Sequence, residues 1–206
     1  MSKNIDFVLE KYPSLDYDYE KRCFHGTLQV SVEDGDSYHL EIFVDQFPNR
    51  FPIVWETRER IPRISDRHCN DDGSLCFTTP PLEEILLRKQ IRTIEVFISD
   101  VLIPFLQNNS YYEINGKYRF GEHSHNWDTA MQHTFIKLTG LDSKFEILAL
   151  VDRILAGLKI RPNSACYCGS GKKIKKCNDH SLRLEDMRRI KRSTLIKGRA
   201  ALAKMI

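Results

Sequence analysis

Cys76 is the residue of this sequence best suited to covalent chemistry, because it ends the segment 68–76, which reads HCNDDGSLC. A thiolate is a strong nucleophile near neutral pH, and a thioester stays reactive towards amines and other thiols. Gly73 and Ser74 predict a tight turn that presents the sulfur at the protein surface. The alternative is that Cys76, between two apolar neighbours, is a small buried hydrophobic residue, as most free cysteines are. The residues that precede it favour the nucleophile.

These neighbours resemble the active-site segment of ubiquitin-conjugating enzymes. In that family a proline-rich stretch leads into His-Pro-Asn and, after a short loop, into Gly-Ser-Ile-Cys, whose cysteine carries ubiquitin as a thioester. This chain has the prolines of 47–52 and Pro62, then His68-Cys69-Asn70, then Gly73-Ser74-Leu75-Cys76. It departs from the family in two ways: Cys69 replaces the proline, and the loop between Asn70 and Cys76 is shorter. The resemblance implies that Cys76 is the catalytic residue.

The same resemblance implies roles for four more residues. His68 shapes the loop by hydrogen bonding, and Asn70 orients it or stabilises the oxyanion formed when an amine attacks the thioester. His123 and His125 follow the region where bacterial members of the superfamily often carry a histidine beside the cysteine. A neutral imidazole there could raise the thiolate fraction of Cys76 or deprotonate the attacking amine. The alternative, a polar loop with exposed histidines, stays open.

A second set of chemistry-bearing side chains lies near the C-terminus. Cys166 and Cys168 supply two thiolates from one turn, and Cys177 and His180 follow a glycine-rich bend. Thiolate and imidazole suit Zn²⁺, and four protein ligands leave the ion no open position, so such a site is structural. The segment resembles the SEC-C motif, a zinc knuckle found at the end of the bacterial secretion ATPase and of many other bacterial proteins. The alternative is a flexible basic tail with unpaired thiols.

Hydrophobic periodicity predicts an α+β protein. Helices are expected at 3–11, along 91–105 with a kink at Pro104, at 128–139, and from Ser143, whose spacing to Glu146 fits a capping box. Strands are expected at 28–32, 38–44 and 52–57. A basic amphipathic helix is expected over 181–206, with apolar side chains facing the main body: Leu184, Met187, Ile190 and Leu195. A helix followed by an antiparallel meander is also the order found in the ubiquitin-conjugating fold.

The expected organisation has three parts. Residues 1–140 form a ubiquitin-conjugating-like (UBC-like) domain, residues 141–160 a helical extension, and residues 161–206 a SEC-C-like zinc knuckle with the basic helix. The net charge is +11 over 159–206 and −8 over the rest of the chain. We favour a solvated basic face over nucleic-acid binding, because no interleaved aromatic residues offer bases a stacking surface.

Composition places the protein in the cytoplasm. Hydrophobic residues make up 41% and charged residues 29% of the sequence, as in ordinary globular proteins. We find neither an apolar run of membrane-spanning length nor a signal sequence at the N-terminus. Cysteines are reduced in the cytoplasm, so the six cysteines are better explained as metal ligands or nucleophiles than as disulfides.

The chain resembles bacterial ubiquitin-conjugating-enzyme homologues of antiphage operons, particularly the short CBASS systems. The resemblance implies an acyltransferase whose Cys76 forms a thioester with the C-terminus of a cyclic-oligonucleotide synthase (CD-NTase). The donor could instead be a ubiquitin-like protein loaded by an activating enzyme. Two other classes stay open: a non-catalytic adaptor of the same fold, and a nucleic-acid-binding or ribosome-binding accessory protein that uses the basic zinc tail.

Overall fold

The computed structural model describes residues 2–31, 35–119, 124 and 126–204. The chain divides into two compact units, the first made of Met1–Thr78 with Leu86–His123 and the second of Thr79–Ile85 with Ser124–Ile206. None of the helices in the described part combines the length and apolar character that crossing a lipid bilayer requires. Each unit has a hydrophobic core of its own.

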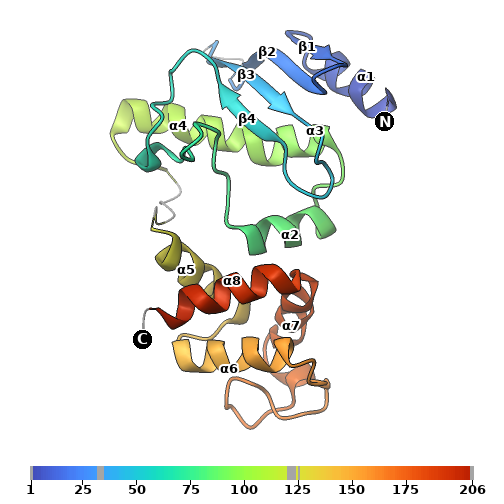
Figure 1. The fold of residues 1–206 in the computed structure, drawn as a ribbon, viewed down its shortest axis with the longest axis vertical. Coiled ribbons are helices and arrows are strands. Elements are labelled where there is room, and N and C mark those ends of the chain that lie inside the picture. Colours follow the sequence, from blue (N-terminus) through green and yellow to red (C-terminus); the bar gives the residue numbers. More distant parts are fainter. Residues whose placement is uncertain (1, 32–34, 120–123, 125, 205–206) are drawn as a thin grey trace. The chain divides into compact units, whose positions relative to one another are not determined.

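A four-stranded antiparallel meander forms one layer of the first unit (Figure 1). Its strands, in spatial as in sequence order, are β1 (Leu15–Asp18), β2 (Cys23–Gln29), β3 (Ser37–Phe43) and β4 (Ile53–Glu56). Burial alternates along β3, with Tyr38, Leu40 and Ile42 in the core, as the period-2 pattern predicts. The N-terminal helix α1 (Ser2–Lys11), β3 and β4 confirm the sequence-based expectation. The strand expected at 28–32 lies earlier in the chain, because β2 begins at Cys23 and ends at Gln29.

A continuous helical segment supplies the other layer of the first unit and packs into the same core (Figure 1). It comprises α3 (Ile94–Phe97), the π-helical turn η2 (Ile98–Leu102) and α4 (Ile103–Asn115). Three of its side chains, Ile98, Leu102 and Leu106, are fully buried. The irregular turn precedes Pro104, which has no N–H to donate to the helical ladder. The helix was expected to kink at this proline, and the irregularity is found instead as a π-helical turn just before it.

Helices make up the second unit. They are α5 (Trp127–Thr139), α6 (Lys144–Leu155), the 3₁₀ turn η3 (Ile174–Lys176), α7 (His180–Arg189) and α8 (Arg192–Ala203). The predicted cap of α6 is present, because Ser143 Oγ accepts a hydrogen bond from Glu146 N at 3.4 Å. Helix α2 (Pro80–Lys89) was not anticipated from sequence.

The single helix expected over 181–206 is wrong. The chain leaves helical geometry at Ile190, with φ −70° and ψ 135°, and restarts as α8. The carboxylate of Glu84, on α2, accepts hydrogen bonds from Lys191 N at 2.5 Å and Thr194 Oγ1 at 2.7 Å. A carboxylate at a helix N-terminus satisfies free N–H groups and interacts favourably with the helix dipole, so Glu84 stabilises the restart of α8.

The apolar residues expected on that helix are buried, and they lie in the core that α7 and α8 share with α5 and α6: Leu184, Met187, Ile190 and Leu195. Helix α5 belongs to this unit, although the expected UBC-like domain extended to residue 140. The compact units therefore differ from the three expected parts, and the assignment of 1–140, 141–160 and 161–206 as functional domains stays a prediction.

Helices α5 and α8 approach closely at Gly198, and this contact generates a prediction. A Cβ atom at position 198 would overlap the Phe135 ring. We expect Gly198→Ala to lower the free energy of unfolding by about 1–3 kcal/mol, because overpacking outweighs the gain in helix propensity. Thermal unfolding monitored by circular dichroism measures this, with Lys197→Ala as the exposed neighbouring control. A Gly198→Ala protein more stable than wild type would contradict the packing described.

Candidate functional site

The segment 68–76 folds as a short β-hairpin, which we call the Cys76 hairpin. Cys69 pairs antiparallel with Leu75, and the flanking hydrogen bonds run from Cys76 N to His68 O at 2.7 Å and from Asn70 N to Ser74 O at 2.8 Å. Cys69 and Leu75 lie in the core, with 8% and 5% of their surface exposed. Cys76, the next residue along the arm that contains Leu75, is half-buried.

The tip of the Cys76 hairpin is held by polar side chains. Asp72 Oδ1 accepts hydrogen bonds from Ser74 N at 2.9 Å and from Ser74 Oγ at 2.6 Å, and these bonds lower the pKa of the Asp72 carboxyl. Asn70 Nδ2 donates to Ser74 Oγ at 2.9 Å. Gly73 has φ +82°, a conformation that glycine adopts without strain. Asn70 thus makes a contact suited to orienting the loop, while its expected part in chemistry stays a prediction.

Leu75 N donates to Val54 O at 2.8 Å and so fixes one arm of the hairpin to β4. The other arm is fixed through Arg67, the last residue of the 3₁₀ turn η1 (Ser65–Arg67). Its buried guanidinium donates to Asn109 Oδ1 at 3.0 Å, lies 3.9 Å from Glu113 Oε1, and stacks 4.5 Å from the Tyr112 ring. All three partners belong to α4. The hairpin is therefore attached on one side to the sheet and on the other to the helical layer.

His68 lies opposite Cys76 in the register of the hairpin. Its backbone is left-handed, with φ 55°, and its N–H donates to Ser65 O at 2.8 Å, which ends the 3₁₀ turn. The imidazole ring is 5.1 Å from the Tyr118 ring and 6.4 Å from the Phe105 ring, measured between centroids. The structure therefore brings His68, Asn70 and Cys76 together on one hairpin. The remaining candidates, His123 and His125, lie outside the described residues.

The cysteines of the first unit differ in their environments. Burial raises the pKa of the Cys23 thiol to about 11, and burial also raises the pKa of Cys69. Both therefore stay protonated at neutral pH, and a protonated thiol is a poor nucleophile. Cys23 is buried at the start of β2. Cys76 is the one of the three with partial access to solvent.

Arg67 and its partners were not recognised from sequence. Asn109 is 42 positions away along the chain, and an isolated arginine before a histidine carries no pattern that distinguishes it from a surface residue. The signal that could have helped is the polar Asn109 within an otherwise apolar helical face. Asn109 is 1% exposed, and a buried amide needs a hydrogen-bonding partner.

The second candidate site is a cluster of Cys166, Cys168, Cys177 and His180, whose potential ligand atoms all lie within 4.8 Å of one another. Cys166 Sγ is 3.2 Å from His180 Nδ1, and Cys168 Sγ is 3.5 Å from Cys177 Sγ. A tetrahedral ion with metal–sulfur bonds of about 2.3 Å separates two sulfurs by about 3.8 Å. The donor set and its spacing therefore fit a metal such as zinc, and the structure confirms that the four predicted residues converge.

Short elements bring these four residues together. Ala165 pairs with Lys173, Cys166 N donates to Lys172 O at 2.7 Å, and the intervening bend contains two glycines of positive φ. Cys177 follows η3, and His180 begins α7. We call the segment 164–180 the knuckle. Its position is fixed by Tyr167, whose hydroxyl donates to Thr139 O at 3.0 Å and whose ring lies 4.9 Å from that of His180.

The thiols of the knuckle are unlike one another before any metal binds. Burial raises the pKa of Cys166, whereas hydrogen bonding by Ser170 lowers the pKa of Cys168. Metal ligation requires thiolates, so binding must release protons, most of all from Cys166. Cys166, Cys177 and His180 are buried, which makes the cluster part of the second core rather than a surface feature.

Comparison with protein-family models, with curated proteins and with solved structures finds no match for this chain. What stands on the structure is an α+β protein with a four-stranded antiparallel meander, helices, and a C-terminal Cys₃His cluster that could hold a metal such as zinc. The assignment to the ubiquitin-conjugating fold stays a prediction.

The attachment of the Cys76 hairpin to α4 predicts a local effect of Arg67→Met. Removing the guanidinium leaves Asn109 Oδ1 buried without its donor, which costs about 1–3 kcal/mol. We expect the amides of Asn70 and Cys76 to lose protection from hydrogen exchange, because their hydrogen bonds join the two arms and the arm that follows Arg67 loses its anchor. Hydrogen exchange followed by mass spectrometry measures this.

Arg60→Met is the matched control. Arg60 binds the same Glu113, at 2.8 Å, but connects it to Asp36 beside β3 rather than to the hairpin. We expect this variant to destabilise the unit while the hairpin amides keep their relative protection. Equal loss of hairpin protection in both variants would show that Arg67 acts only through global stability.

Proposed function

We propose that this protein is a ubiquitin-conjugating-enzyme-like acyl carrier whose nucleophile is Cys76. The observation that carries the proposal is the Cys76 hairpin, which buries Cys69 while leaving Cys76 partly accessible opposite His68. An N-terminal helix, an antiparallel meander, this hairpin and a helical layer follow one another in the order expected for the ubiquitin-conjugating fold. The order supports the proposal together with the Gly-Ser-x-Cys sequence.

The proposed step is acyl transfer to the Cys76 thiolate. The sulfur attacks the activated C-terminal carbonyl carbon of a partner protein, a C–S bond forms, and the bond from that carbon to its leaving group breaks. An acyl-adenylate made by an activating enzyme is one such donor, and AMP then leaves. The thioester subsequently passes the acyl group to an amine or is retained. Asn70 and His68, on the same hairpin, are the described residues nearest in register to assist.

For the donor we propose the C-terminus of a CD-NTase in an antiphage operon, with a ubiquitin-like protein as the other candidate. The acidic main body and the basic C-terminal region offer a large partner two surfaces of opposite charge. Docking at both would raise the local concentration of the acyl terminus at Cys76. A non-catalytic adaptor would dock in the same way without forming the covalent bond.

We propose in addition that the knuckle binds one structural Zn²⁺ through Cys166, Cys168, Cys177 and His180. Four protein ligands exclude a substrate from the ion, so its role is to stabilise the second unit. Three of the four ligands are buried in the core of that unit, and Tyr167 connects them to the end of α5. The metal would therefore stabilise the helical packing as well as the knuckle.

The acyl-carrier proposal predicts a covalent adduct at Cys76. After co-expression with the neighbouring operon proteins, we expect a band on non-reducing gels that excess thiol removes from the wild-type protein. In Cys76→Ser the adduct should resist thiol, because an ester replaces the thioester, and Cys76→Ala should form none. Mass spectrometry of the peptide that contains Cys76 identifies the attached C-terminus.

Cys69→Ser is the control. Because Cys69 is buried, we expect this variant to form the same adduct as the wild-type protein. An adduct that persists in Cys76→Ala but disappears in Cys69→Ser would show that Cys69, and not Cys76, is the nucleophile. Stable association of the two proteins with an unmodified Cys76 would identify an adaptor instead.

The zinc proposal predicts about one equivalent of zinc per purified chain. Cys177→Ser should lower the zinc content and the unfolding temperature together, because metal binding is coupled to folding. Elemental analysis and calorimetry measure the two effects, and Lys175→Gln, next to η3, is the neighbouring control. Full zinc content in Cys177→Ser would place the metal elsewhere.

A further inference from the structure

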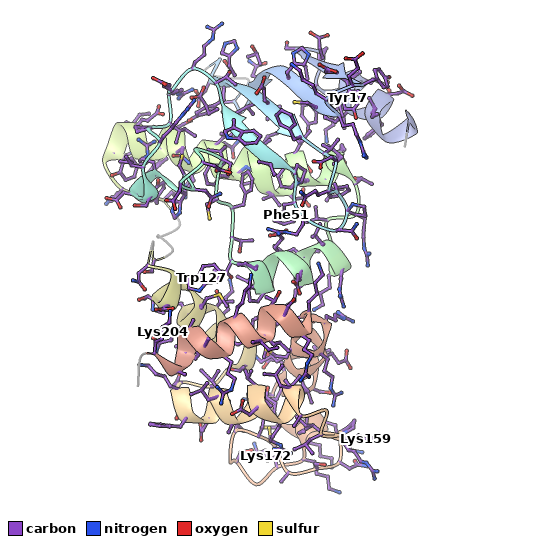
Figure 2. The ribbon with its side chains drawn as sticks, viewed as in Figure 1. Tyr17, Phe51, Trp127, Lys159, Lys172 and Lys204 are labelled. Carbon is purple, nitrogen blue, oxygen red and sulfur yellow. The ribbon has the colours of Figure 1, made fainter. Side chains whose placement is uncertain are left out.

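A hollow of about 460 Å³ lies on the second unit, lined by the C-terminal end of α6, the residues that follow it, and Arg188 of α7. We call it the α6–α7 hollow. Its apolar lining comes from Ile154, Leu158 and Pro162, and its cations are Lys159, Arg161 and Arg188. In Figure 2, Lys159 is labelled at the same end of this unit as Lys172 of the knuckle. None of the proposed metal ligands or hairpin residues lines the hollow.

The apolar part of the hollow arises from how α6 ends. Gly157 has φ +69° and Leu158 N donates to Arg153 O at 3.0 Å, which is a Schellman termination of the helix. In such an ending the residue after the glycine usually packs against the preceding turn. Here Leu158 stays 56% exposed, at the edge of the hollow. Local helix capping therefore leaves an apolar side chain available to a ligand.

A backbone carbonyl, rather than a carboxylate, holds Arg188 at the hollow, and Arg192, outside the lining, is held in the same way. Arg188 Nη2 donates to Ile160 O at 2.6 Å, and Arg192 Nη1 donates to Leu155 O at 2.5 Å. These neutral acceptors orient the guanidinium groups and leave their charge uncompensated. Within the described residues, no carboxylate lies at ion-pair distance from Lys159, Arg161 or Arg188.

Three carboxylates on or next to helices of the second unit form ion pairs with cations that do not line the hollow. Asp152 binds Arg199, Asp179 binds Arg183 at 2.8 Å, and Asp186 binds Arg189 at 3.3 Å. These three carboxylates therefore do not neutralise the cations that line the hollow.

We propose that the α6–α7 hollow binds an acidic peptide segment of a partner protein, with one apolar side chain of the peptide in the hollow and its carboxylates against the surrounding cations. A hollow of this volume accommodates a leucine or phenylalanine side chain. Its walls are aliphatic, so it offers nucleic-acid bases no aromatic surface to stack on. A carboxylate matches the fork of an arginine whose other contacts are neutral. This inference does not depend on the chemistry proposed for Cys76.

Fluorescence anisotropy with the full-length, zinc-loaded protein tests the proposal. The probes are labelled peptides of about ten residues: an Asp/Glu-rich peptide with a central Leu-Phe, the same peptide with Ser-Ser, and a Lys-rich peptide with Leu-Phe. At about 0.15 M salt we expect the first to bind about tenfold more tightly than either of the others, since it alone provides both the anchor and the charge. A labelled single-stranded RNA of similar charge is the fourth probe.

Two variants localise the binding. Leu158→Ser removes the exposed apolar contact without disturbing the core, and Arg188→Gln removes one oriented charge; each should weaken binding of the first peptide about fivefold to tenfold. The double variant Lys175→Gln, Lys176→Gln removes more charge from the knuckle, outside the hollow, and should weaken binding less than either. Equal or larger loss in the knuckle variant, tighter RNA binding, or no preference for the apolar anchor would each overturn the proposal.

Discussion

The pairing of Cys69 with Leu75 places the Cys69 thiol in the core and sets Cys76, which is half-buried, opposite His68. The register is held at three points: Leu75 on β4, Arg67 on α4, and the Asp72–Ser74 contact at the tip. The sheet and the helical layer of the first unit therefore both help to fix the position of the Cys76 sulfur atom.

The core of the second unit is built from short helices, and the knuckle lies between α6 and α7 in the chain. Its knuckle contributes Cys166 and Cys177 to the apolar cluster, and His180 is buried beside them, where polar groups are costly unless they are paired. A bound metal would pair these groups, and its binding free energy would add to the stability of the folded unit. The cations of the hollow follow the end of α6, and Pro162 of the hollow accepts a hydrogen bond from Lys175 N of the knuckle at 3.0 Å, so the two proposed sites adjoin without sharing a ligand residue.

Sequence patterns predicted what depends on neighbouring residues and missed what depends on distant ones. The alternation along β3, the Ser143 cap and the four residues of the knuckle are local features, and all three were predicted. The break between α7 and α8 was not, because the residues there have helical periodicity and Glu84, which caps α8, is 107 positions away. Strand β1 was also missed, although its four residues alternate between apolar and polar side chains. Arg67 was missed because its partner Asn109 is identifiable only once α4 is placed.

The contact between Glu84 and α8 also bears on how the chain folds during synthesis. Residues 79–85 emerge from the ribosome with the first unit but pack in the second, and Glu84 is 7% exposed in the finished protein. At about 5–20 residues per second, roughly 5–20 s pass before Lys191 appears. During that interval residues 79–85 of α2 follow the first unit in the chain, but Lys191 and Thr194, which bind Glu84 in the finished protein, have not yet been synthesised. The nascent first unit can therefore bury Leu87, at the C-terminal end of α2, before the partners of Glu84 have been synthesised.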